Sequence, residues 1–122
     1  MISDIRGFLC DDDHLRVFGE GACRLLHVIE ETGSLLAAAM SMGMAYTKAL
    51  AIMRRAEKNL GFPLTARRIG GKGGGGSVLT PKAKEFLHDY EAYRDACIQS
   101  SRELYSQIFS KYTADGSSGK SV

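Results

Sequence analysis

The stretch that decides the fold is residues 33–50, which read GSLLAAAMSMGMAYTKAL. Ser34 is a favoured helix N-cap, so a short helix is predicted over residues 35–42. Gly43 should end this helix, because glycine accepts the positive φ that a tight turn requires. Ala39, four positions before it, is small enough for the following helix to cross closely. The spacing therefore predicts a helix-turn-helix.

The second helix of this motif should begin near residue 44 or 45 and end at Leu60, where Gly61 closes it. Its predicted buried face consists of Ala49, Ile52, Met53, Ala56 and Leu60. The opposite face consists of Tyr46, Thr47, Leu50, Ala51, Arg54 and Lys58. In a DNA-binding helix-turn-helix, the outward face near the helix N-terminus reads base edges in the major groove. Taken alone, the pattern fits a helical hairpin with a solvated basic face equally well.

A glycine-rich run follows this helix, GGKGGGGS at residues 70–77. β-prone segments lie on both sides of it, LTARRI at residues 64–69 and VLT at residues 78–80. Two short strands around a glycine loop predict a β-hairpin. Next to a basic helix, such a hairpin is typical of a winged helix, whose wing approaches phosphates or the minor groove. A flexible linker is the alternative, and the symmetric β-prone segments count against it.

Basic side chains are concentrated in this part of the chain. Residues 45–84 hold nine basic side chains and one acidic side chain, a net charge of +8. The remaining residues hold seven basic and thirteen acidic side chains, a net charge of −6. Such segregation is expected when one stretch faces a polyanion. The alternative is a helical protein-interaction module whose basic face serves only solubility, which would not need this concentration.

We therefore predict a surface that binds double-stranded DNA. Tyr46, Thr47 and Lys48 lie at the base-reading end of the second helix, and Arg54 and Arg55 lie where phosphates would run. The hairpin would contact the DNA backbone or the minor groove. The predicted DNA-binding residues are Ser34, Ala45, Tyr46, Thr47, Lys48, Arg54, Arg55, Arg67, Arg68, Lys72, Gly73 and Gly74.

Further elements are predicted on the N-terminal side. Residues 1–13 form an acidic lead-in, and residues 14–18 (HLRVF) alternate like one short strand. A helix should begin near Glu20 and end at Thr32, where Gly33 caps it. Its core-facing stripe consists of Ala22, Leu25, Leu26 and Ile29.

A long helix is predicted from Pro81, a favoured first helical residue, to about Tyr112. At 1.5 Å per residue it would be on the order of 45 Å long, more than one small domain needs. Its apolar side chains recur near 3.5-residue spacing, which is typical of helices that pair with another chain. We therefore predict a homodimer held by Phe86, Tyr90, Tyr93, Cys97, Leu104 and Ile108.

The predicted fold class is mainly α with a small β-hairpin. The predicted domains are a lead-in at residues 1–13, a winged helix-turn-helix at 14–80, a dimerisation helix at 81–113 and a disordered tail at 114–122. The chain has no apolar run of 18 residues, and its start lacks the basic flank and apolar run of a signal peptide. Its three cysteines are widely spaced, so a cytoplasmic protein is expected.

Residues 33–87 resemble the N-terminal winged-helix domain of the ModE-type molybdate-responsive regulators, and more distantly the LysR-type DNA-binding domain. The resemblance is carried by GSLLAAAMSMGMAYTKAL and by RRIGGKGGGGSVLTPKAKEFL at residues 67–87. Between them, MRRAEKNLGFPLTAR resembles the LysR pattern of basic residues, a Leu-Gly turn and Pro-Leu. The resemblance implies a homodimeric transcriptional regulator with Tyr46, Thr47 and Lys48 at its base-reading end.

The chain departs from the family in two respects. Ala45 stands where the family usually has a serine at the start of the recognition helix, which implies the loss of a cap or phosphate contact. Full-length members also carry C-terminal oxyanion-binding domains, for which a chain ending at Val122 has no room. We therefore expect no molybdate site and no cofactor in this chain.

Three other motifs are weaker. Residues 71–76 match the dinucleotide pattern GxGxxG, but a strand follows where a helix must receive the pyrophosphate. Residues 114–121 (ADGSSGKS) loosely match a phosphate-binding loop, but the chain ends one residue later. Two CxxxH pairs, Cys10 with His14 and Cys23 with His27, offer four potential zinc ligands, although a cysteine beside a core stripe, such as Cys23, is commonly a small buried residue. We expect no metal and, because the histidines are scattered without a nucleophile–base pair, no enzyme.

Overall fold

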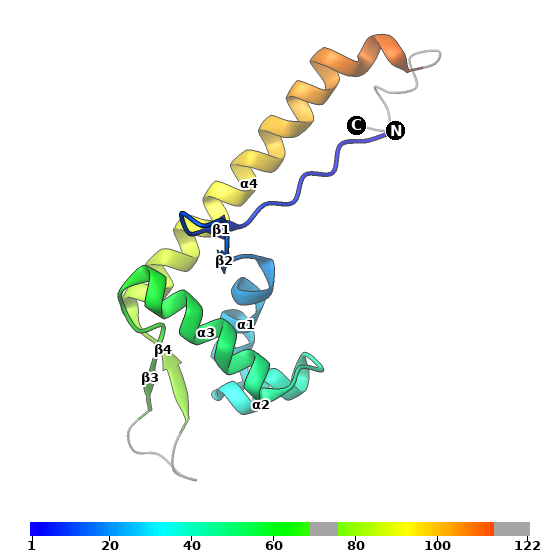
Figure 1. The fold of residues 1–122 in the computed structure, drawn as a ribbon. Helices are drawn as coiled ribbons and strands as arrows, with labels where there is room; N and C mark the ends of the chain where they lie inside the picture. The colour runs from blue at the N-terminus through cyan, green and yellow to red at the C-terminus, as the bar shows by residue number, and fades with distance from the viewer. Residues whose placement is uncertain (69–75, 114–122) are drawn as a thin grey trace. The chain divides into compact units, whose positions relative to one another are not determined.

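The computed structural model describes residues 1–68 and 76–113 (Figure 1). The fold is mainly helical with two short antiparallel strand pairs, so the predicted fold class is confirmed and a second hairpin is added. In chain order the elements are β1 (Leu9–Cys10), β2 (Arg16–Phe18), α1 (Glu20–Thr32), α2 (Leu35–Ser41), α3 (Tyr46–Leu60), β3 (Thr65–Arg67), β4 (Ser77–Leu79), α4 (Pro81–Phe109) and the 3₁₀ turn η1 (Ser110–Tyr112).

The chain divides into two compact units, and each is described by itself. The 8–87 unit contains every element from β1 to β4 together with the first turns of α4. The terminal unit comprises residues 1–7 and the chain from His88 onwards.

Helix α1 begins and ends at the predicted residues. Gly33 caps its C-terminus with φ +84°, and the Gly33 N–H donates to the carbonyl oxygen of Ile29. The whole predicted stripe is buried, and Cys23 is buried beside it. Sequence periodicity therefore located this helix and its core face correctly.

Helices α2 and α3 form the predicted helix-turn-helix geometry. Ser34 caps α2, because its Oγ accepts a hydrogen bond from the Ala37 N–H at 2.9 Å. Gly43 has φ +64° in the turn, and Ala39 is fully buried. The chain direction changes by 118° between α2 and α3, within the range of such motifs.

No single helix in the described part of the chain is both long and apolar enough to cross a membrane. The pair α2 and α3 reaches the required length and composition only jointly, across the 118° bend.

Helix α3 begins at Tyr46, slightly later than predicted, because Ala45 is still extended and forms the N-cap. Ala49, Met53 and Ala56 are buried as predicted, whereas Ile52 and Leu60 are only half-buried. The side chains on the predicted outward face are exposed apart from the half-buried Leu50. The helix thus has one face in the core and one face toward solvent.

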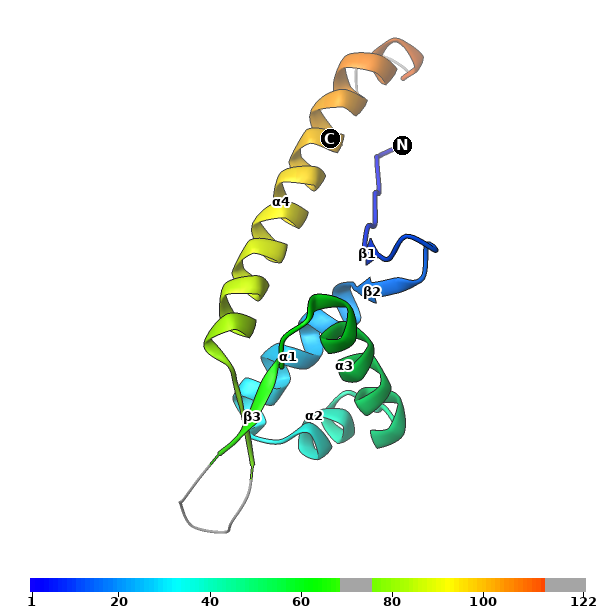
Figure 2. The same ribbon diagram turned by 60° about the vertical axis from the view of Figure 1, so that its left-hand side comes forward.

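The β3–β4 hairpin is shorter than predicted, with Thr65 opposite Leu79, Ala66 opposite Val78 and Arg67 opposite Ser77. Its glycine-rich tip, residues 69–75, lies outside the described residues. Figure 2 shows the strand pair beside the junction of α1 and α2. A backbone hydrogen bond of 2.7 Å from the Ser77 N–H to the Gly33 oxygen fastens the hairpin there.

Glu57, the single acidic residue in the basic stretch, also fastens this hairpin. Its Oε2 accepts a hydrogen bond of 2.8 Å from the Leu64 N–H, and the Leu64 side chain is fully buried. A hydrogen bond to an ionised acceptor contributes about 1.5–3 kcal/mol. The carboxylate therefore joins α3 to the start of the hairpin rather than neutralising a neighbouring cation.

The β1–β2 hairpin was not predicted, because part of it was assigned to the acidic lead-in. Asp11 closes it: its Oδ1 accepts hydrogen bonds from the Asp13 and Leu15 N–H groups at 2.9 and 3.0 Å. Phe18, fully buried, packs edge-on against Phe86 with the ring centroids 4.9 Å apart. The acidic triplet is therefore a turn, and β2 belongs to the core of the 8–87 unit.

In the terminal unit, residues 1–7 run beside α4. The Tyr105 hydroxyl donates to the Met1 carbonyl oxygen at 2.8 Å, and the Ser3 and Ser101 hydroxyls lie 2.9 Å apart. Tyr105 stacks on Phe109 at 5.5 Å between centroids. The helix ends at Phe109, followed by η1, slightly before the predicted end.

Candidate nucleic-acid interface

The N-terminus of α3 is free to meet a ligand. Tyr46 and Thr47 are exposed, and the N-cap Ala45 supplies no side-chain hydrogen bond. No acidic residue lies in the first turn. The unpaired N–H groups and the helix dipole therefore make this end attractive to anions. The absence of a side-chain cap agrees with the expectation from Ala45.

A hollow of about 330 Å³ separates this helix end from the β3–β4 hairpin. It brings together three residues that were predicted to bind DNA: Ser34 before α2, Tyr46 at the start of α3 and Arg67 in β3. The complete lining is Ser34, Leu35, Leu36, Tyr46, Thr65, Ala66, Arg67, Gly76 and Ser77.

Four of the predicted DNA-binding cations have no carboxylate partner in the described part of the chain. Within residues 1–68 and 76–113, none of Lys48, Arg54, Arg55 and Arg67 forms an ion pair with a carboxylate. By contrast, Lys84 lies 3.9 Å from a carboxylate oxygen of Glu30. The unpaired charges are therefore available to a polyanion, for which counterion release supplies the affinity.

The exposed Arg68 side chain lies against the main chain where the hairpin meets the end of α1. A Cβ added to Gly76 would lie 2.7 Å from Arg68 Nη2 and 2.9 Å from the Gly33 oxygen, so only glycine fits between them. The guanidinium lies beside Gly33, at the negative end of the α1 dipole. This geometry favours a positioning role for Arg68, and a direct DNA contact by it stays a prediction.

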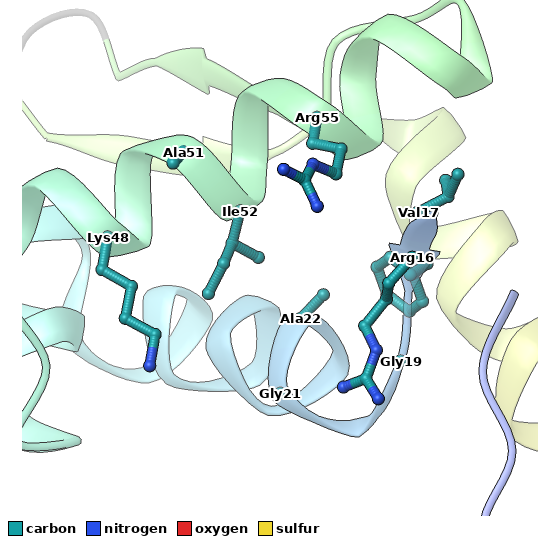
Figure 3. Close-up of a pocket in the computed structure, with 10 residues that line it drawn as sticks. Arg16, Val17, Gly19, Gly21, Ala22, Lys48, Ala51, Ile52 and Arg55 are labelled. Atoms are coloured by element: carbon teal, nitrogen blue, oxygen red, sulfur yellow. The ribbon is translucent and has the colours of Figure 1, made fainter. Parts of the chain in front are cut away.

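The remaining predicted DNA-binding residues of α3 lie either on its outward face or in a second hollow. Arg54 is exposed on the outward face of α3, near the middle of the helix. Lys48 and Arg55 line a second hollow, together with Arg16 of β2, which sequence reasoning missed (Figure 3). Arg16 lies in the short strand predicted at residues 14–18. The only sign of a binding role in the sequence was its positive charge within that strand. Lys72, Gly73 and Gly74 lie outside the described residues.

Some of the predicted dimer residues are packed within the chain, and others are exposed. Phe86 belongs to the 8–87 unit, where it packs against Phe18 and Phe62, with ring centroids 4.9 and 6.3 Å away. Tyr90 is buried. Four members lie exposed on α4: Tyr93, Cys97, Leu104 and Ile108.

Tyr93 and Cys97 are neighbours on consecutive turns of α4. A hydrogen bond between their side chains, reinforced by the charge interaction with the thiol, raises the pKa of Tyr93 above its ordinary value. The Tyr93 phenol is therefore uncharged near pH 7.

No family model matches the chain. Over 68 residues it is 38% identical to the molybdenum-pterin-binding protein MopB of Rhodobacter capsulatus, covering 56% of this chain and 25% of that protein. Over 63 residues it is 41% identical to the molybdenum transport protein ModE of Herbaspirillum seropedicae, covering 52% and 23%. The chain therefore spans about a quarter of the length of these curated relatives, and about half of it is similar to proteins named for molybdenum.

Proposed function

We propose that the chain is a winged-helix transcriptional regulator that binds double-stranded DNA in a sequence-specific manner as a homodimer. The proposal is carried by a hollow that brings the uncapped, exposed α3 N-terminus and Arg67 of β3 together, beside α3 cations that form no ion pair with any described carboxylate. The resemblance to the ModE-type regulators and the similarity to MopB and ModE support it. Because the match covers about a quarter of each of those proteins, the molybdenum in their names is not part of the function proposed for this chain.

Helix α3 would enter the major groove with its N-terminus toward the bases. Tyr46 and Thr47 are the exposed side chains at that end, and each base contact would discriminate by about 1–3 kcal/mol. Arg54 would neutralise phosphates. Arg67, on the hollow between α3 and the hairpin, would hold the DNA strand that passes between these two elements. The hairpin would act as the wing, on the backbone or in the minor groove.

The dimer would form through the exposed apolar side chains of α4. Leu104 and Ile108 are 54% and 52% exposed, and they follow one another at helical spacing. A dimer would present two α3 helices to major grooves about 34 Å apart. Replacing both residues with glutamate should convert the dimer to a monomer in light scattering, whereas Gln107→Glu should not. A wild-type chain that is monomeric would refute the dimer.

Selection from a random duplex pool, followed by fluorescence anisotropy, tests DNA binding. Arg54→Ala combined with Arg55→Ala should weaken binding to all duplexes alike, whereas Tyr46→Ala combined with Thr47→Ala should change which sequences are preferred. Arg24→Ala with Arg102→Ala is the matched control, because both arginines are exposed and line neither hollow. A wild-type chain that enriches no sequence and binds no duplex would refute the proposal.

A helical protein-interaction module is the second candidate. It is favoured by the exposed apolar side chains of α4, among them Tyr93 at 60% exposure. In that case the α4 substitutions would change assembly, while the charge substitutions on α3 would have no measurable effect on any duplex.

A further inference from the structure

Helix α3 is flanked by a hollow on each side. Tyr46 lines the hollow beside the β3–β4 hairpin, whereas Arg55 lines a second hollow against β2 and α1. The two residues are nine positions apart, which is two and a half helical turns, so they lie on opposite sides of α3. The second hollow has a volume of about 210 Å³.

Three cationic side chains surround this second hollow (Figure 3). Lys48 and Arg55 extend from α3 toward α1, and Arg16 extends from β2 beside Gly19. No acidic side chain lines the hollow, and among the described residues none of the three cations is in an ion pair. Like charges gathered without a carboxylate repel one another, so an anion bound there would be stabilised by all three.

Arg16 is held in place before any ligand arrives. Its guanidinium carbon lies 4.1 Å from the centre of the Phe8 ring, a cation–π contact. A side chain at Gly19 would meet the Cβ of Phe8 at 3.1 Å and the Cδ of Arg16 at 3.7 Å, so the glycine leaves room for this stack. A cation whose rotamer is already fixed loses less entropy when it binds.

The rest of the lining is apolar, with Val17, Ala22 and Ile52 among its members. A cationic rim around an apolar floor matches the alternation of phosphate and deoxyribose along a DNA strand. A helix in the major groove, about 12 Å wide, has one strand on each side. If the strand on the hairpin side passes Arg67, the other strand must pass the side of α3 that carries Arg55 and Lys48.

We propose that this hollow is a second binding site for the DNA backbone, in which Arg16, Lys48 and Arg55 hold phosphate and Ile52 contacts deoxyribose. The proposal rests on the proposed function. It adds Arg16 to the interface and moves Lys48 from base reading to backbone binding. The β1–β2 hairpin then serves to carry and orient a DNA-binding arginine.

The test is a salt titration of binding to a selected duplex and to an unrelated duplex. Arg16→Gln and Arg55→Gln should each weaken both complexes by a similar factor and reduce the slope of log K against log salt by about 0.9 per lost phosphate contact. Lys48→Gln should do the same without changing the preferred sequence. Arg24→Gln is the control, because it removes one exposed charge from α1 without touching the hollow.

The outcomes separate the two proposals. If the wild-type chain binds no duplex, the proposed function fails. If it binds with sequence preference but Arg16→Gln and Arg55→Gln match Arg24→Gln in affinity and slope, only the second backbone site is refuted. If Arg16→Gln lowers the melting temperature, Arg55→Gln decides, since its exposed side chain has no stack to lose. A change in the preferred sequence for Lys48→Gln would show that Lys48 contacts bases, and would refute its assignment to the backbone site.

Discussion

The two hairpins of the 8–87 unit are alike in size but are held by different forces. Two main-chain N–H groups fasten β3–β4: Ser77 donates to the Gly33 carbonyl oxygen, and Leu64 donates to the Glu57 carboxylate. Side chains fasten β1–β2, through the Asp11 turn and the Phe18 ring. Both hairpins bring an arginine to a hollow beside α3. The β3–β4 hairpin therefore depends on Glu57 and on the glycines that its main chain approaches, whereas the β1–β2 hairpin depends on the Phe18 ring and the Asp11 carboxylate.

The largest expected effect comes from removing the ring that anchors the first hairpin. Phe18→Ala should lower the free energy of unfolding by about 3–5 kcal/mol, because it leaves a cavity beside Phe86. Leu64→Ala, at the residue just before β3, should lower the free energy of unfolding by about 2–5 kcal/mol. Urea titration followed by circular dichroism measures both. The exposed Val78 in β4 is the control, and Val78→Ala should change little. Equal, small losses at Phe18 and Val78 would contradict the packing described for β2.

Removing the carboxylate that fastens each hairpin should also lower the free energy of unfolding by different amounts. Glu57→Ala should cost about 1.5–3 kcal/mol, because it removes a charged acceptor from the part-buried Leu64 N–H. Asp11→Ala should cost about 0.5–1.5 kcal/mol, since the N–H groups that it releases are exposed and can bind water. Urea midpoints at constant slope provide the comparison. A loss at Asp11 as large as that at Glu57 would show that the turn, and not the ring, anchors the first hairpin.

Local signals in the sequence predicted one of these hairpins but not the other. Ser34, Gly43 and the β-prone segments around the glycines act through neighbours in the chain, so α2, α3 and the β3–β4 hairpin could be read directly. The first hairpin depends on Phe18 meeting Phe86, 68 positions later, which no local pattern records.

The same difference explains the outcome for the candidate site. Tyr46 and Thr47 could be placed from helical spacing alone, and the structure exposes both. Arg16 was missed because its position depends on a ring eight residues earlier in an unpredicted strand pair. Arg68 was assigned to DNA because its charge was visible in the sequence, whereas its packing against Gly33 and Gly76 was not.

The uncapped start of α3 offers a stabilising change on the side of the second hairpin. Ala45→Ser should raise the free energy of unfolding by about 1 kcal/mol, because Ala45 already has the extended N-cap conformation and serine would accept a hydrogen bond from a first-turn N–H. Thermal melting measures the gain. Ser34→Ala, which removes the existing cap of α2, should cause a loss of similar size. If Ala45→Ser does not raise the melting temperature, the first turn of α3 already has its N–H groups satisfied.

The smallest expected effect sharpens the comparison at the first hairpin. Phe8→Leu removes the aromatic ring under Arg16 but keeps an apolar side chain, and an exposed cation–π contact contributes about 0.5–1 kcal/mol. If the stack serves to orient Arg16 for phosphate, DNA affinity should fall by about two- to fivefold, with no change in the preferred sequence. Phe8→Tyr keeps the ring and should keep the affinity. Fluorescence anisotropy on one selected duplex compares the two variants. Equal affinities for Phe8→Leu and Phe8→Tyr would mean that Arg16, if it binds phosphate, does so without prior orientation by Phe8.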